Sequence, residues 1–145
     1  MDKISQLDAA LSTLVRVLII QERRISNDIS TISFNPLDLE VLSFLGDTPN
    51  VPAKNIAAYL KISPTTMQSV IDRLEKRGFL VKDKSALKGR SIAISLTADG
   101  VQFRDLMHAT NLQNCKFMLE AIDPLDQERF VDSMVKIAAK MTKAV

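Results

Sequence analysis

Residues 63–77 carry side chains whose types and spacing suit contact with a nucleic acid. Ser63-Pro64 predicts a helix start, with the serine as N-cap and the proline as the first helical residue. Four apolar residues then recur at the spacing of one buried helix face: Met67, Val70, Ile71 and Leu74. Short hydroxyls, an amide and then cations remain for the opposite face: Thr65, Thr66, Gln68, Ser69, Asp72, Arg73 and Lys76. Any amphipathic surface helix shares this pattern, so it needs support from its neighbours.

The chemistry of that outer face matches duplex DNA. Glutamine pairs bidentately with adenine, hydroxyls suit phosphates or bases, and arginine or lysine suits guanine or phosphate. We therefore predict DNA contacts from one set of residues on this helix: Ser63, Thr65, Thr66, Gln68, Ser69, Arg73 and Lys76.

A second cluster of cations follows, where the hydrophobic period changes from helical to alternating. Phe79-Leu80-Val81 and residues 91–96 predict two short strands, with Ile92, Ile94 and Leu96 on one face. The connecting tip carries Gly89 and several cations, and Lys84, Lys88 and Arg90 are predicted to contact DNA. We expect Arg90, at the foot of the second strand, to be the largest single contributor to affinity outside the helix that follows Ser63.

The distribution of charge agrees with a polyanionic partner. The chain of 145 residues has a net charge of +2, but residues 53–90 hold nine basic and three acidic residues, a net +6. The remainder holds ten basic and fourteen acidic residues, a net −4. A basic segment between acidic flanks is typical of a nucleic-acid-binding module on an otherwise neutral scaffold.

The remaining elements are predicted to be mostly helical. Residues 3–30 form a long helix whose heptad seam comprises Ile4, Leu7, Leu11, Leu14 and Leu18. A helix starting at Asn35-Pro36 ends near Gly46, and Ala53–Leu60 forms a short helix before the tight turn Lys61-Ile62-Ser63. Thr97 caps a helix to about Ile122 that is apolar on two faces. Asp123-Pro124 caps the last helix, with a stripe that includes Phe130, Met134, Ile137 and Met141.

Catalytic and metal sites are not expected. His108 and Cys115 could share a helix face, but they make at most half a zinc site and are expected to be buried or half-buried packing residues. Asp38 and Glu40 sit near a helix start, where they favour the helix dipole. We expect no enzyme activity, no cofactor and no metal. A single cysteine fits the cytoplasm, and without an apolar run of about eighteen residues we expect no membrane span.

Nearly the whole chain resembles the MarR family of winged helix-turn-helix regulators. The resemblance rests on Ser63-x-Thr65-x-Met67, on the block from Ile71 to Leu80 that contains DRLEKRGFL, and on Arg90 followed by the SLTADG block. It implies a mainly α fold with a small β-hairpin wing, in which 1–145 is a single MarR-like unit. Residues 34–98 would form the DNA-binding part, and 1–33 and 99–145 the dimerisation helices.

The resemblance also implies a homodimer on palindromic DNA, usually a repressor relieved by a small ligand. The expected dimerisation residues are Ile4, Leu7, Leu11, Leu14, Leu18, Phe130, Ile137 and Met141. A ligand cavity is expected between the N-terminal helix, the helix from Leu37 and the start of the helix from Thr97. The sequence departs from the family at Lys88, where an acidic residue is usual; this departure increases the charge of the wing.

Two other functional classes stay open at this point. A winged-helix module can bind protein instead of DNA, although Arg73 and Lys76 on the second helix argue against that. An enzyme using an inter-helical cavity is disfavoured, because no acid–base machinery is visible.

Overall fold

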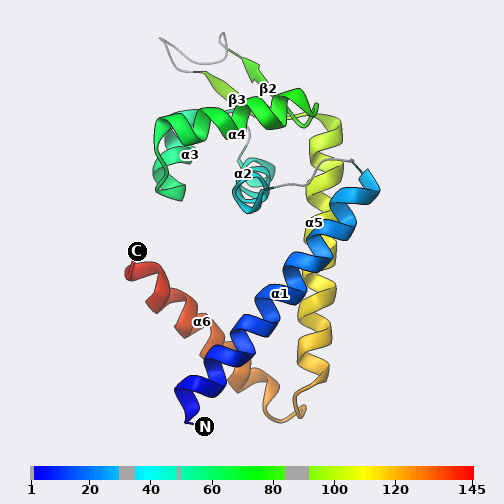
Figure 1. Cartoon of the computed structure of the whole chain (residues 1–145), viewed down its shortest axis with the longest axis vertical. Coiled ribbons are helices and arrows are strands. Elements are labelled where there is room, and N and C mark those ends of the chain that lie inside the picture. Colours follow the sequence, from blue (N-terminus) through cyan, green and yellow to red (C-terminus); the bar gives the residue numbers. More distant parts are fainter. Residues whose placement is uncertain (1, 30–34, 49, 84–91) are drawn as a thin grey trace. The chain divides into compact units, whose positions relative to one another are not determined.

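The computed structural model of the chain describes residues 2–29, 35–48, 50–83 and 92–145 (Figure 1). The elements run in the order α1 (Lys3–Ile29), α2 (Pro36–Asp47), β1 (Val51–Pro52), α3 (Ala53–Leu60), α4 (Pro64–Lys76), β2 (Leu80–Asp83), β3 (Ala93–Leu96), α5 (Ala98–Glu120) and α6 (Gln127–Lys143). They divide into two compact units, Met1–Met107 and His108–Val145. The predicted fold class, mainly α with a small β wing, is confirmed.

Local capping sets the helix starts that the sequence predicted. The Asn35 side chain accepts a hydrogen bond of 2.9 Å from the backbone N–H of Leu37, at the start of α2. Ser63 Oγ accepts one of 3.1 Å from Thr66 N–H at the start of α4, and Thr97 Oγ1 accepts one of 3.1 Å from Gly100 N–H in α5. Each bond satisfies a donor that the first helical turn leaves unpaired.

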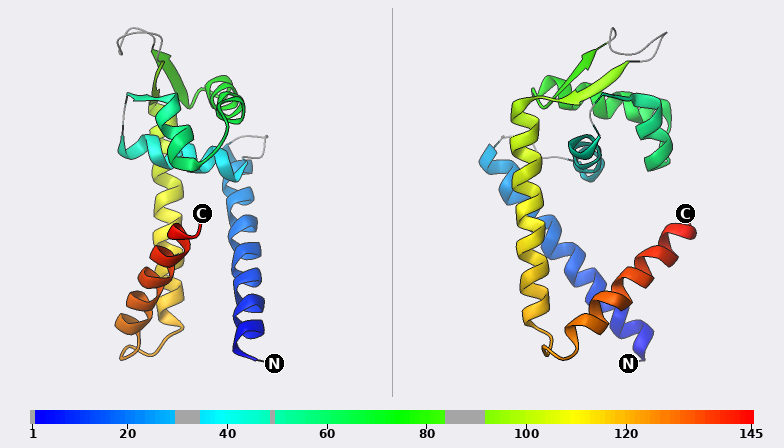
Figure 2. Two further views of the ribbon diagram at one scale, coloured as in Figure 1. Left: turned by 90° about the vertical axis from the view of Figure 1, so that its left-hand side faces the viewer. Right: turned by 180° about the vertical axis from the view of Figure 1, so that it is seen from behind.

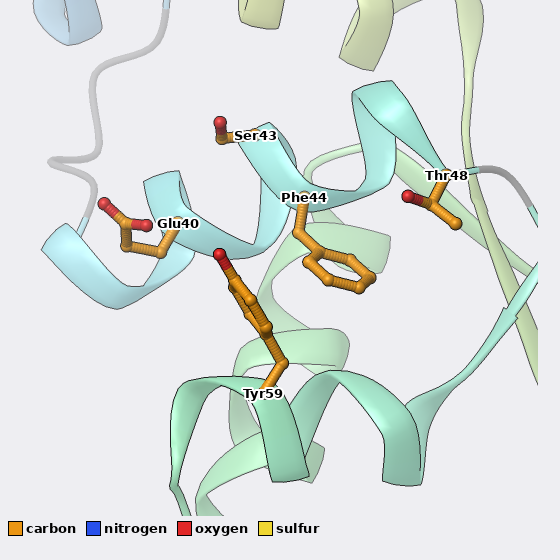
Figure 3. A pocket seen from close by; sticks show the side chains of 5 residues that line it. All are labelled: Glu40, Ser43, Phe44, Thr48 and Tyr59. Carbon is orange, nitrogen blue, oxygen red and sulfur yellow. The ribbon is translucent and has the colours of Figure 1, made fainter. Parts of the chain in front are cut away.

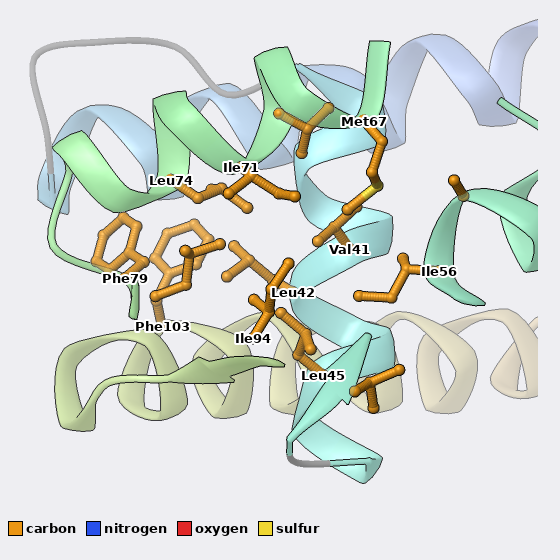
Figure 4. Close-up of a cluster of buried hydrophobic side chains, with 14 of the residues drawn as sticks. Val41, Leu42, Leu45, Ile56, Met67, Ile71, Leu74, Phe79, Ile94 and Phe103 are labelled. Carbon is orange, nitrogen blue, oxygen red and sulfur yellow. The ribbon is translucent and has the colours of Figure 1, made fainter. Parts of the chain in front are cut away.

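One apolar core joins α2, α3, α4, the sheet and the start of α5 (Figure 4). Its buried side chains include Val41, Leu42, Leu45, Ile56, Met67, Val70, Ile71, Leu74, Phe79, Ile94 and Phe103. Phe79 and Phe103 stack at the end of α4, with ring centroids 5.3 Å apart. The predicted buried face of α4 is therefore confirmed, and its opposite face is left to solvent.

The sheet has three strands, not the two of the predicted hairpin. β3 lies in the middle and pairs antiparallel with β2, Leu80 opposite Leu96, and with β1, Val51 opposite Ile94 (Figure 2). Ala93 is buried as well as Ile94, so the strict alternation of buried and exposed residues expected from the sequence is lost. The two-residue strand β1 is too short to leave a periodic signal.

Most apolar side chains in the second half of α5 and in α6 are exposed within the single chain. Only Gly100, Phe103 and Met107 are buried in α5, and α6 has no buried residue. The two apolar faces predicted for α5 are therefore largely uncovered in the single chain, and Phe117 is 72% exposed. His108 and Cys115 are also exposed rather than buried. The last helix begins at Gln127, after a turn closed by a hydrogen bond from Asp126 N–H to Asp123 O.

Helix α1 contains a segment that is more apolar than the sequence analysis allowed. Lys3–Arg24 is long and apolar enough, by length and composition alone, to cross a membrane, with a mean hydropathy of 1.3 in its most apolar part. The expectation that no such stretch exists is therefore wrong. Packing helices of soluble proteins meet the same criterion, so this property does not by itself identify a membrane span.

Candidate nucleic-acid interface

Helices α3 and α4 form a helix-turn-helix whose turn is held by backbone geometry. Lys61 ends α3 in the left-handed conformation, at φ 56°, and the N–H of Ile62 returns to Ala57 O over 3.0 Å. Ser63 then caps α4 within two residues. A turn this short holds the two helices in a defined orientation and presents the first turns of α4 at the surface.

The exposed side of α4 carries the hydroxyls predicted for DNA contact. Ser63, Thr65, Thr66 and Ser69 are all exposed. Ser63 Oγ also donates to Thr66 Oγ1 over 2.9 Å, and Ser69 Oγ donates to Thr65 O over 3.2 Å. The structure thus brings these residues together on one face, although three of the hydroxyls already make intramolecular bonds.

Arg73 does not face freely outward as the sequence analysis predicted. Its guanidinium makes two hydrogen bonds with Asp38 of α2, from Nη2 to Oδ1 over 2.6 Å and from Nε to Oδ2 over 3.2 Å. The Asp38 side chain is 1% exposed and the Arg73 side chain 41%. The Asp38 bond raises the pKa of Arg73, which stays charged. Arg73 therefore couples α4 to α2, and Asp38 is a buried partner rather than a residue that merely favours the dipole.

Sequence reasoning missed Asp38, although a signal was present. Asp38 lies three and four residues before Val41 and Leu42, so the helical period places it on the buried face of α2. A carboxylate at such a position predicts a buried cationic partner, because an isolated buried charge is costly. The helical period does not identify which of the nine basic residues between positions 53 and 90 is the cationic partner.

A second polar cluster links the outer face of α4 to strand β2. Asp72 accepts a hydrogen bond of 2.9 Å from Gln68 Nε2 and one of 3.0 Å from Lys82 Nζ. Lys82 Nζ also lies 3.3 Å from Glu75 Oε1. The Lys82 bond, followed by that of Gln68, lowers the pKa of Asp72, and the Asp72 bond raises the pKa of Lys82. Lys82 is thus neutralised locally by two acids.

Lys76 completes the described part of the interface and is exposed near the end of α4. The predicted contacts Lys84, Lys88 and Arg90 lie outside the described residues, so their roles remain predictions.

The predicted dimerisation residues lie on α1 and α6. Ile4, Leu7, Leu11 and Leu14 are 83%, 56%, 48% and 42% exposed, and Leu18 is half-buried. Phe130, Ile137 and Met141 are exposed on α6. Both helices therefore present apolar surface that the single chain leaves uncovered.

A small pocket lies between α2 and α3 (Figure 3). It encloses about 260 Å³ and is lined by Glu40, Ser43, Phe44, Thr48 and Tyr59. The rings of Phe44 and Tyr59 are tilted at 46°, with centroids 4.9 Å apart. A second hollow, of about 330 Å³, lies between α3 and α4, with Met67 and Gln68 in its lining. The cavity expected between α1, α2 and the start of α5 stays a prediction.

No group of three or more potential metal-ligating side chains occurs among residues 2–29, 35–48, 50–83 and 92–145.

The arrangement defines a winged helix-turn-helix protein: a capped second helix, a tight turn before it and an antiparallel sheet beside it. Residues 32–91 match the model of the MarR family. These 60 of the 145 residues are therefore similar to a family of winged helix-turn-helix transcriptional regulators.

Individual relatives of similar sequence are also named as transcriptional regulators or repressors. The chain is 26% identical over 98 residues to the uncharacterised HTH-type transcriptional regulator YkoM of Bacillus subtilis, a match that covers 68% of this chain. It is 28% identical over 94 residues to the HTH-type transcriptional repressor Mb2911 of Mycobacterium bovis, over 64% of this chain. The match spans 64% of the length of YkoM, less than two thirds, and 68% of the length of Mb2911.

Solved structures share the fold at lower sequence identity. The crystal structure of Streptococcus pneumoniae FabT in complex with DNA matches with a TM-score of 0.85 and 15% identity, over 99% of this chain and 100% of that one. A MarR transcriptional regulator from Methanosarcina mazei matches with a TM-score of 0.75 and 19% identity, over 100% of this chain and 94% of that one.

Proposed function

We propose that this chain regulates transcription, as a repressor, by sequence-specific binding of double-stranded DNA through α4 and the wing. The proposal rests on the difference between the two faces of α4. One face is buried in the core, and the other presents Gln68, Lys76 and a row of hydroxyls to solvent. FabT, which shares the fold, was crystallised with DNA, and Mb2911 is named a repressor. The predicted location of such a regulator is the cytoplasm.

A protein-binding winged helix is less well supported. The argument from Arg73 no longer counts against it, because that cation is bound to Asp38. The exposed Lys76, the basic middle segment and the MarR-family match still favour DNA.

Fluorescence anisotropy with the purified chain tests the proposal. A random-sequence duplex and a duplex enriched from a randomised pool are titrated at several salt concentrations. We expect the logarithm of the affinity to fall linearly with the logarithm of salt, and the enriched duplex to bind at least about 10³-fold tighter. Weak, salt-independent binding of both duplexes would reject DNA binding as the function.

Two substitutions on α4 separate base reading from backbone contact. Gln68 lies in the second turn of α4, so Gln68→Ala should reduce preference for the enriched sequence, by about 1–3 kcal/mol if the contact is bidentate. Lys76 lies at the end of α4, so Lys76→Ala should weaken binding to both duplexes alike and flatten the salt slope by about one unit. An equal loss for specific and random DNA in both variants would contradict this assignment.

The proposed regulator acts as a homodimer formed by α1 and α6. Large exposed apolar surface is unusual on a soluble monomer and marks an interaction surface. Two-fold symmetry would present two copies of α4 to half-sites about one DNA turn apart. Light scattering should give twice the chain mass at micromolar concentration. Leu11→Glu should yield monomer, whereas Ser12→Glu, at the neighbouring exposed position, should leave the dimer intact.

Relief of binding by a small molecule is part of the same proposal. Burial raises the pKa of Glu22 in α1, and the nearby carboxylate of Glu40 in α2 raises it further. Acidic groups of α1 and α2 therefore approach each other next to the expected ligand junction. A thermal-shift screen of small organic molecules, repeated with DNA present, tests this: an effector should stabilise the free protein and release the duplex.

A further inference from the structure

The amide of Gln68 is held in one orientation by a neighbour on its own helix. Asp72 Oδ1 accepts the 2.9 Å hydrogen bond from Gln68 Nε2. An ionised carboxylate only accepts hydrogen bonds, so the nitrogen end of the amide must face Asp72; the reverse orientation would place two acceptors together. Lys82 keeps this carboxylate in place through its own bond of 3.0 Å.

This orientation leaves a defined edge for a ligand. One N–H of Gln68 is used by Asp72. Among the described residues, Oε1 and the second N–H have no hydrogen-bond partner, so they present an acceptor beside a donor. Adenine offers the complementary pair in the major groove, the N6 donor and the N7 acceptor, whereas guanine offers two acceptors. A fixed amide therefore favours adenine, and a freely rotating amide would accommodate either purine more easily.

The charge of Asp72 also affects the affinity for DNA irrespective of its sequence. Its side chain is 58% exposed on the face of α4 that carries Gln68. A negative charge there repels phosphates, and its bond to Lys82 occupies a cation that could otherwise contact the backbone. Asp72 thus weakens non-specific binding while it orders the base-reading side chain.

From this geometry we propose that Asp72 is a specificity-determining positioning residue: it orients Gln68 for base reading and restrains Lys82 from the DNA backbone. The inference rests on the proposed DNA-binding function. It predicts opposite effects on two measurable quantities, a combination that simple damage to the fold would not produce.

Asp72→Ala tests the inference in the full chain. We expect tighter binding to the random-sequence duplex and a salt slope about one unit steeper, because a negative charge is lost and Lys82 keeps only Glu75 as an acidic partner. Selection from a randomised duplex pool should show weaker preference at one base pair of each half-site, by roughly 5- to 150-fold, the range of a good bidentate contact.

Glu75→Ala provides the matched control. Glu75 is on the same helix, carries the same charge and also contacts Lys82, but it makes no hydrogen bond with Gln68. This variant should bind random DNA more tightly and keep the base preference of the unmodified chain. The double variant Gln68→Ala with Asp72→Ala should show the same preference as Gln68→Ala alone, because both act through one contact.

The outcomes separate a failure of the proposed DNA-binding function from a failure of the role proposed for Asp72. If the unmodified chain binds neither duplex at low salt, the proposed function fails and this inference with it. If it binds and discriminates, and Asp72→Ala keeps the preference at every base pair, only this inference is overturned. An equal loss of specific and random affinity in Asp72→Ala would also overturn it, because the role would then be structural. Circular dichroism melts confirm that each variant is folded.

Discussion

The ion pair between Asp38 and Arg73 should respond asymmetrically to loss of either partner. Arg73→Met leaves a carboxylate whose side chain is 1% exposed without its cation, a change that costs about 3–5 kcal/mol in buried pairs. Asp38→Asn leaves a guanidinium that is 41% exposed and can be hydrated by water. That loss should cost about 1–3 kcal/mol, the value of hydrogen bonds to a charged group. Arg73→Met should therefore be the more damaging change.

Urea unfolding followed by circular dichroism measures both variants. All proteins are compared at one chain concentration, because self-association makes stability concentration-dependent. Lys76→Met, an exposed lysine on the same helix, is the control and should shift stability by less than about 0.5 kcal/mol.

A loss of stability in Asp38→Asn that equals the loss in Arg73→Met would refute the reasoning.

Four further substitutions test local features of the structure. Ser63→Ala removes the side-chain cap of α4 and should cost about 1 kcal/mol of unfolding free energy, measured by urea titration. Gly100→Ala should cost about 1–3 kcal/mol, since its methyl would collide with the backbone carbonyl just before β2; Gly46→Ala meets only a flexible arginine side chain and should cost much less in the same titration. The Asp72 carboxyl pKa, lowered first by the Lys82 bond, should rise in Lys82→Met, as measured by NMR titration.

Features encoded within a few residues could be predicted from the sequence. Ser63-Pro64 marks the start of α4, and Gly78, at φ 80°, marks its end as predicted. The buried stripe of α4 follows from its period because one core covers that face. Capping and helical period are local, so no knowledge of distant partners is needed.

Features that depend on distant partners could not be predicted. Arg73 looks like an outward cation until α2 brings Asp38 to it from 35 positions away. The strand β1 exists only because Val51 pairs with Ile94. The apolar faces of α5 predict burial, yet Phe117 is exposed, because a period indicates that a face is apolar and not which molecule covers it.

The ion pairs of Arg73 and Lys82 also change how the net charge of residues 53–90 is interpreted. The middle segment has a net charge of +6, but Arg73 is bound to Asp38 and Lys82 to Asp72 and Glu75. Counterion release depends on cations that reach phosphates, not on formal charge. The ion pair of Arg73 instead links α4 to α2, and the ion pairs of Lys82 link α4 to β2. Part of the excess of basic residues therefore positions α4 rather than contacting DNA in the proposed complex. Affinity in the proposed complex must then depend on the other cations, and discrimination on the bonds that these two maintain.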